Sequence, residues 1–478
     1  MKRTADGQGH RRGVRDGFDR NGSVKCESCF DRKLEIDRLR EENKALKDKL
    51  KRALARDVIP LGAHSPPSQR IYKAKSTDAK TGLRGGAQPG HKGAGRICIQ
   101  PEVADAVIRV PAPEDCADCN CRLGFHDLRQ RSVYDVEDAN VKLRVYEVER
   151  RKCPRCEKLK QSPIPVLPRA LYSNALLARV AVMHYLHGVP LGRVCEILGP
   201  EINLSGVLAA LHRLAKIWKP AMAPLINEFR SSPVKHADET GWRIDGEPGW
   251  SWLFCTPSVS IFQCQNSRSA RVARQVLGDD PLPGVLVVDR FSAYNKMPCQ
   301  LQYCYAHLLR EVKKLADDYP GCDEVDRFTT ILCDLLSAAM TLPSQSMSEA
   351  DYSERANAIA GQIAAMASAP SQHIGIQSVQ RIFSTSKDRL FQWVLNRKVP
   401  SHNNRAEREL RQTVIARKVS FGSQSEQGAE TRSILMSILV TAKKRLNDSW
   451  IESWFAQALN QLVAGRDDPF SLLPPVPT

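Results

Sequence analysis

The sequence predicts a mixed α/β protein in which a sheet of short strands is covered by helices. Three observations support this fold class. Apolar runs of strand length recur between residues 229 and 305, a helical pattern interrupts them, and long helical stretches follow. Strands, a helix and then further strands are typical of a mixed sheet with helices on its faces. At roughly 100 to 200 residues per domain, the 478 residues also predict about three folded units.

The charge balance predicts a polyanionic partner. The chain carries 70 Lys and Arg against 53 Asp and Glu, a formal charge of +17, and such an excess favours nucleic acid because neutralised phosphates release counterions. The first residues have no apolar stretch behind them, and no apolar run approaches the roughly 18 residues of a membrane span. We therefore expect a cytoplasmic protein, bound to the nucleoid when on DNA, with its fifteen cysteines reduced.

The N-terminal part predicts a helix with a heptad pattern. Residues 1–30 are basic and expected to be disordered, and residues 31–56 are predicted to form a coiled-coil helix. Asn43 is a polar residue at an a position of the heptad, which favours a dimer with a fixed register. The alternative is one amphipathic helix packed on its own domain. The heptad positions are Ile36, Leu39, Asn43, Leu46, Leu50 and Ala53.

Residues 57–100 have the composition of a linker. Between residues 68 and 96 there are seven basic residues, six glycines and a single acid, Asp78. Such a segment cannot bury a core, so it is predicted to be flexible and to lie along a DNA backbone, unless it is only a solvated spacer.

Two Cys-x-x-Cys pairs predict a structural zinc site in residues 101–165. The pairs are Cys116 with Cys119 and Cys153 with Cys156, and they flank a segment whose apolar residues alternate as in a strand. Two pairs joined by a hairpin form a zinc ribbon, in which four thiolates give a closed tetrahedral site. Cys121 competes with Cys119 as the second ligand, and four unrelated core cysteines are the alternative.

Residues 166–228 are predicted to be helical. The pieces 191–198 and 204–214, separated by Gly199 and Pro200, have the proportions of a helix-turn-helix that binds DNA. An ordinary helical hairpin has the same pattern.

Three acids in residues 229–450 suit a two-metal phosphoryl-transfer site. Asp238 and Asp289 follow short apolar runs, and ligands of α/β sheets lie at the carboxyl ends of strands. Capping of a turn is the alternative for Asp289. The third acid, Glu407, opens a helix, where an exposed ion pair with Arg411 is the alternative.

Asp238 and Glu407 each have an acidic neighbour that must also be considered as a metal ligand. Side-chain alternation sends Glu239 to the face opposite Asp238, so only one of them can join the site. Ala406, Leu410 and Val414 form the expected buried stripe of the helix, and Glu407 and Glu409 border it on opposite edges.

Cations and a helical insertion surround the third acid. Five basic residues are predicted to hold DNA phosphates, and a helical insertion is predicted at about 308–398, with breaks at Pro343 and Pro370. A C-terminal helix and tail are expected over 451–478. The five basic residues are Arg405, Arg408, Arg411, Arg417 and Lys418.

The motifs together resemble the transposases of the insertion-sequence-66 family. The resemblance covers the Leu-rich helix, the Gly-Gly-Ala-Gln-Pro-Gly-His-Lys-Gly segment from Gly85, the two cysteine pairs, the acidic motifs and Cys-Tyr-Ala-His-Leu-Leu-Arg from Cys304. It implies a ribonuclease-H-like core and an Asp-Asp-Glu (DDE) catalytic set. The family motifs select Asp238 over Glu239, and Glu407 over Glu409.

The resemblance implies cleavage and strand transfer of the DNA of a bacterial insertion sequence. Asp238, Asp289 and Glu407 would bind two Mg²⁺ ions, for which Mn²⁺ can substitute. The expected partners are the ends of the element, target DNA, a second copy through the coiled coil, and accessory proteins of the same element. The alternatives are a ribonuclease-H-like nuclease without strand transfer, a zinc-containing DNA-binding regulator, and an inactive domesticated transposase.

Overall fold

The computed structural model describes residues 35, 38–44, 46, 99–137, 140–168, 170–446, 450–465 and 468–477. The chain divides into two compact units, one of Met1–Ser65 and Leu301–His402 and the other of Pro66–Gln300 and Asn403–Thr478. Within the described residues, no helix is long and apolar enough to cross a membrane.

A four-stranded sheet lies in the region where a zinc site is predicted. Strand β3 (Asn140–Lys152) pairs antiparallel with the long β2 (Gly124–Glu137) and with the short β4 (Leu159–Gln161), and parallel with β1 (Ala106–Val110). The alternating apolar residues of the sequence lie in β3, as predicted. Because one cysteine pair precedes β2 and the other follows β3, the β2–β3 hairpin joins the two pairs.

Helices follow in the order that the sequence predicts. Helix α3 (Leu191–Leu198) has the predicted bounds, and α4 runs four residues further than expected, Leu204–Trp218. The described residues between Ser173 and Ser231 also form α2 (Asn174–Ala181), a π-helical turn (Val182–Leu186) and α5 (Met222–Ser231). The C-terminal helix α14 (Ile451–Val463) packs against α2, and the amides of Asn174 and Asn460 are hydrogen-bonded at 2.8 Å.

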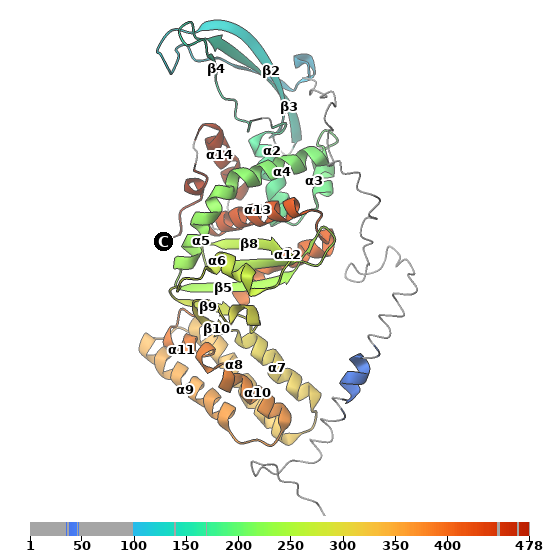
Figure 1. The fold of residues 1–478 in the computed structure, drawn as a ribbon, viewed down its shortest axis with the longest axis vertical. Helices are drawn as coiled ribbons and strands as arrows, with labels where there is room; N and C mark the ends of the chain where they lie inside the picture. The colour runs from blue at the N-terminus through green and yellow to red at the C-terminus, as the bar shows by residue number, and fades with distance from the viewer. Residues whose placement is uncertain are drawn as a thin grey trace, which may run out of the picture. The chain divides into compact units, whose positions relative to one another are not determined.

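The central sheet of this unit contains β9, β5, β7 and β8 in that order (Figure 1). Strand β5 (Val234–Gly241) is parallel to β9 (Val285–Val288) and antiparallel to β7 (Trp250–Cys255), which is antiparallel to β8 (Ser260–Gln265). Helix α6 (Ala270–Leu277) is the helical pattern that interrupts the strands, and it connects β8 to β9. All four residues of β9 are buried, as its continuous apolar sequence predicts.

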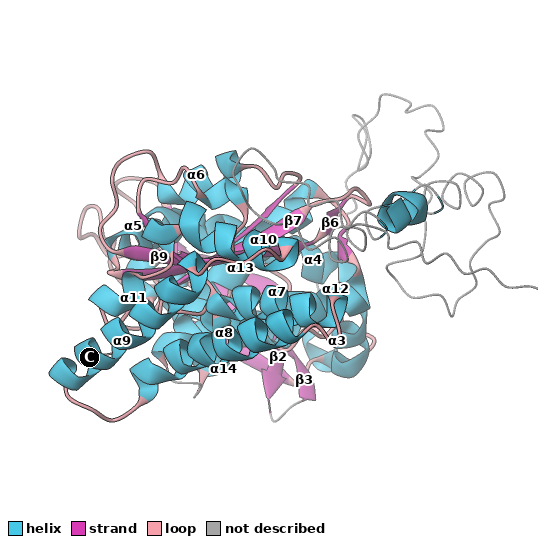
Figure 2. Cartoon of the chain, turned by 90° about the horizontal axis from the view of Figure 1, so that it is seen from below, coloured by secondary structure: helices cyan, strands magenta, loops and turns pink. Residues whose placement is uncertain are grey.

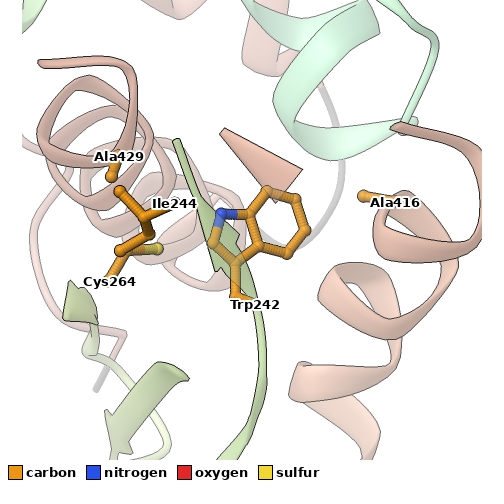
Figure 3. Packing of buried hydrophobic residues seen from close by; sticks show 5 residues of the cluster. All are labelled: Trp242, Ile244, Cys264, Ala416 and Ala429. Carbon is orange, nitrogen blue, oxygen red and sulfur yellow. The ribbon is translucent and has the colours of Figure 1, made fainter. Parts of the chain in front are cut away.

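The segment 242–244 does not add a strand to this sheet. Strand β6 (Arg243–Ile244) instead pairs parallel with β11 (Gly422–Ser423). A turn at Asp245 and Gly246, both with positive φ, ends β6 after two residues. Figure 3 shows the indole of Trp242 in the cluster with Ile244, Cys264, Ala416 and Ala429.

Helices α12 (Asn404–Ser420) and α13 (Glu426–Arg445) pack on the sheet. The buried stripe of α12 is Ala406, Leu410, Thr413 and Ala416, whereas Val414, which was expected there, is only half-buried.

A ladder of hydroxyl groups on α13 covers strand β8. Ser433, Ser437 and Thr441, spaced four residues apart, accept hydrogen bonds from the backbone N–H groups of Cys264, Phe262 and Ser260 at 2.8–3.0 Å. A strand with only one partner leaves backbone donors that need acceptors. The ladder therefore satisfies the outer edge of β8, and Figure 1 shows α13 running beside it.

The unit Leu301–His402 is helical after the last residues of strand β10 (Gln300–Tyr303). The expected breaks are present, because Pro343 lies in a 3-10 turn after α8 and Pro370 follows the end of α9. Figure 2 shows α7 to α11 as helices. Their bounds are Tyr305–Asp318, Asp323–Thr341, Glu349–Ser368, Ile374–Thr385 and Gln392–Leu395.

Candidate functional site

Strand register brings Asp238 and Asp289 to corresponding positions on adjacent parallel strands. In the pairing of β5 with β9, His236 lies opposite Val287. Two residues further along the chain are Asp238, within β5, and Asp289, which directly follows the end of β9. Side chains two residues apart lie on the same face of a strand. Because His236 and Val287 are neighbours in the sheet, the two aspartates are expected to be neighbours as well, at the end of β9. Asp289 Oδ1 also accepts from the Phe291 N–H at 2.9 Å, so the turn role predicted as the alternative is present as well.

Burial and neighbouring negative charge perturb Asp238. Desolvation raises the pKa of Asp238 to about 8, with further contributions from the charges of Glu239, Asp289 and Glu407, while the Glu239 N–H, which donates to the carboxylate, lowers it. The three candidate acids therefore interact electrostatically. A divalent cation in such a site would reverse this pKa shift because it favours the ionised carboxylate.

Helix α12 is fixed against β5 through Asn403. Asn403 occupies the N-cap position of the helix, but its side chain makes no capping hydrogen bond. Instead its amide accepts from His236 Nδ1 at 3.0 Å and donates to the Ala237 carbonyl at 2.8 Å. Glu407 lies one helical turn after Asn403, and Asp238 directly follows Ala237. The buried amide thus sets the position of the third acid relative to the first.

The neighbouring acids have other partners. Glu409 forms an ion pair with Lys444 of α13 at 2.7 Å and accepts from the Ser260 hydroxyl at 2.7 Å. Glu239 is buried and accepts from Arg268 and Tyr294. The carboxylates of Glu239 and Glu409 therefore each have partners other than the three candidate acids.

The three acids do not form a compact single-ion cluster. In the described part of the chain, the ligand atoms of Asp238, Asp289 and Glu407 do not all lie within 4.8 Å of one another. Two-metal sites hold ions about 3.5–4 Å apart, so their outer ligands are spread more widely than those around one ion.

The five basic residues of α12 differ in environment. Arg408, Arg411 and Lys418 are exposed, and Arg405 is half-buried. Arg417 donates from Nη1 to the Gly241 carbonyl at 2.7 Å and to the Thr240 hydroxyl at 3.1 Å. It therefore ties α12 to the end of β5.

The two cysteine pairs form one cluster. The sulfur atoms of Cys116, Cys119, Cys153 and Cys156 all lie within 4.8 Å of one another. The separations Cys116–Cys156, Cys116–Cys119 and Cys119–Cys153 are 3.7, 3.6 and 3.5 Å. A tetrahedral zinc with Zn–S bonds of about 2.3 Å places sulfurs about 3.8 Å apart. Cys121 is not a member of the cluster, so Cys119 is the better second ligand.

The two pairs also share one backbone conformation. The residue after each pair, Asn120 or Glu157, has positive φ and donates its N–H to the carbonyl of the first cysteine. The Cys156 N–H points at Cys153 Sγ at 3.4 Å and is the largest cause that lowers the pKa of Cys153, to about 6. These matched turns form a preorganised four-cysteine site that could hold a metal ion.

The fold and these two sites define a mixed α/β protein with an acidic centre on a parallel strand pair and a four-cysteine metal-type site. The chain belongs to the Transposase IS66 family, which matches residues 169–431, more than half of its length. Family membership makes it a transposase, a class of enzyme that binds and cleaves DNA. The matched segment contains all three candidate acids and begins after the cysteine cluster.

Two relatives come from Sinorhizobium fredii, and both are described as uncharacterized proteins. The chain is 27% identical to protein y4jD over 403 residues, which cover 75% of this chain and 76% of the relative. It is 24% identical to protein y4qI over 345 residues, which cover 64% and 62% of the two chains.

Sequence reasoning missed the roles of Asn403 and Arg268. A single asparagine before a helix predicts at most a helix cap and carries no signal for a contact with a distant strand. Arg268 was not singled out at all. Its signal lies in the structure, where it is the partner of the buried Glu239.

Proposed function

We propose that this protein cleaves the ends of an insertion sequence and joins them to target DNA by DDE chemistry. Asp238, Asp289 and Glu407 are the proposed ligands of two Mg²⁺ ions. The observation that carries the proposal is the register of β5 with β9, which gives Asp238 and Asp289 corresponding positions, while Asn403 fixes the helix of Glu407 beside them.

The sheet supports a ribonuclease-H-like core. Three antiparallel strands, β8, β7 and β5, are extended by β9, which is parallel to β5 and reached through α6. This mixed arrangement is what the family resemblance implies for residues 229–450, with the helical insertion between β10 and α12.

The residues of the chain have distinct proposed roles in the reaction. Two divalent ions, when bound, would polarise the phosphodiester and activate a water or a DNA 3'-hydroxyl for in-line attack. The carboxylates orient the reacting groups, and a bound cation would lower the pKa of Asp238, which burial and the neighbouring acids raise. The exposed Arg408, Arg411 and Lys418 attract the DNA backbone, which the acids would otherwise repel.

The cysteine cluster is proposed to be a structural zinc ribbon in residues 101–165. Four closely spaced thiols and two matched turns suit a closed site without an open coordination position. Residues 166–228 are proposed to be a helical DNA-binding segment. The heptad helix, of which Leu39 and Leu46 are exposed, is proposed to pair with a second copy.

The experiment that tests the function incubates the protein with linear DNA carrying the element ends, supercoiled target DNA and Mg²⁺. Joined products are the expected result. Cleavage without joining would instead identify a ribonuclease-H-like nuclease. Metal-independent binding with no cleavage of any DNA would identify a zinc-containing regulator.

A further inference from the structure

Glu239 holds an arginine beside the acidic site. Its side chain is 1% exposed, and Oε1 accepts from Arg268 Nε at 3.0 Å and from Nη2 at 2.8 Å. Oε2 accepts from the hydroxyl of the buried Tyr294 at 2.7 Å. Both carboxylate oxygens are thus occupied by donors from the chain, so Glu239 holds neighbouring groups and is not needed as a metal ligand.

Two aromatic rings hold the guanidinium of Arg268. Its central carbon lies 4.4 Å from the ring centroid of Trp250 and 4.0 Å from that of Phe291. Cation–π contact and the paired hydrogen bonds to Glu239 fix the plane of the group. The Arg268 side chain nevertheless remains 41% exposed. Among the described residues, only Nε and Nη2 of Arg268 donate hydrogen bonds to the protein, so the fixed guanidinium of this partly exposed side chain keeps a donor for a ligand.

Chain connectivity places this arginine next to the acids. Glu239 directly follows Asp238, and Phe291 and Tyr294 lie two and five residues after Asp289. Glu239 and Asp289 interact electrostatically, and so do Tyr294 and both aspartates. The loop that carries Asp289 is therefore held to β5 through the same network that holds Arg268.

A helix N-terminus adds donors at the same place. Helix α6 begins at Ala270, and the hydroxyl of its N-cap residue Ser269 makes no capping hydrogen bond. The Trp252 indole N–H donates to the Ser267 carbonyl at 3.1 Å and fixes the turn that precedes the helix. Backbone N–H groups at a helix N-terminus attract anions. Since α6 begins only two residues after Arg268, its N-terminal N–H groups and the guanidinium are donors close together in the chain.

We propose that Arg268 is a DNA contact residue that binds a backbone phosphate next to the scissile bond, and that Glu239 is its positioning residue. The proposal rests on the proposed function, because it takes the acids to be the reaction centre. A guanidinium suits this task since its planar donors match phosphate oxygens. Glu239 then serves the site indirectly, by keeping one cation and the Asp289 loop in place.

The test measures affinity for mixed-sequence duplex DNA over a range of salt concentrations. Arg268→Gln should make the log-log salt slope shallower by about 0.9, the value for one lost phosphate contact. Arg274→Gln removes a half-exposed charge from helix α6, which begins two residues after Arg268; Arg274 pairs with Asp279 at 3.7 Å, and its loss should leave the slope unchanged. Equal slopes for Arg268→Gln and the wild type, or equal changes for both variants, would overturn the proposal.

A second measurement uses the unmodified protein, in case Arg268→Gln does not fold. Phenylglyoxal, which modifies guanidinium groups, is applied with and without bound DNA, and modified peptides are quantified by mass spectrometry. DNA should protect Arg268 but not Arg274, and equal modification of Arg268 in both samples would overturn the proposal. Both readouts measure binding, so they remain valid if the wild type cleaves no DNA, which would refute the proposed function and not the phosphate contact.

Discussion

Asn403 at the start of α12 is hydrogen-bonded to His236 of β5, with 3.0 Å between Asn403 Oδ1 and His236 Nδ1. Both side chains are buried, and the Asn403 amide also donates to the carbonyl of Ala237. Since an amide oxygen only accepts, the His236 nitrogen carries the proton. One buried amide thus joins two segments that are 167 residues apart in the sequence and that carry Asp238 and Glu407.

Asn403→Ala should lower both stability and activity. The substitution removes the acceptor of the His236 N–H and a donor to the Ala237 carbonyl, and each buried hydrogen bond lost in this way costs about 1–3 kcal/mol. Urea unfolding measures the first effect, and Mg²⁺-dependent cleavage by the folded variant measures the second. Asn404→Ala changes the exposed neighbour and should match the wild type. If Asn403→Ala were as stable and as active as Asn404→Ala, Asn403 would not position the helix.

Cys153→Ser should reduce the zinc content of the purified protein. Losing one of four thiolates opens the site, and the metal supplies much of the folding energy of a small ribbon. Zinc is measured by elemental analysis, together with thermal unfolding of the variant. Cys121→Ser is the matched control because Cys121 lies outside the cluster. Unchanged zinc in Cys153→Ser, or equal losses in the two variants, would rule out this ligand set.

Replacing Leu39 and Leu46 with Lys should abolish self-association through the N-terminal helix. Both leucines are about half exposed in the single chain, at 48% and 58%. Two charges in the seam of a coiled coil would have to be desolvated. Sedimentation of the full chain should show a smaller species with unchanged helical content. If the wild type is monomeric even at high concentration, the prediction of a coiled coil is wrong.

Replacing residues 68–96 with a Gly/Ser linker of equal length should weaken the salt dependence of DNA binding. The segment lies outside the described residues, so the prediction comes from its seven basic residues. Each lost phosphate contact should make the slope shallower by about 0.9. If the slope stays the same, the segment is only a spacer.

Much of the fold follows from local patterns in the sequence. Helix α3 has the predicted bounds, and the four buried residues of β9 form one apolar run. These elements are predictable because a strand buried on both faces, or a helix buried on one face, requires a regular pattern of apolar residues close together in the sequence. The family resemblance supplied the choice of acids, which periodicity left open.

The remaining features depend on contacts between distant segments. The pairing of β6 with β11 joins residues 243–244 to 422–423, and no local pattern indicates it. The hydroxyls of Ser433, Ser437 and Thr441 are understandable only beside the edge of β8. Strand alternation predicts that the Glu239 side chain points away from Asp238 and does not bind the metals. In the structure, Glu239 is buried and accepts hydrogen bonds from Arg268 and Tyr294.

The most direct measurement compares strand transfer by Asp289→Asn and Glu409→Gln in Mg²⁺, with both proteins shown to be folded. Asp289→Asn keeps the size of the side chain but removes the charge proposed to hold both metals, so cleavage and transfer should be lost together while DNA binding persists. Glu409→Gln gives up an ion pair with Lys444 and should be less stable but active. Strand transfer by Asp289→Asn, or an inactive Glu409→Gln beside an active Glu407→Gln, would contradict the proposed metal site.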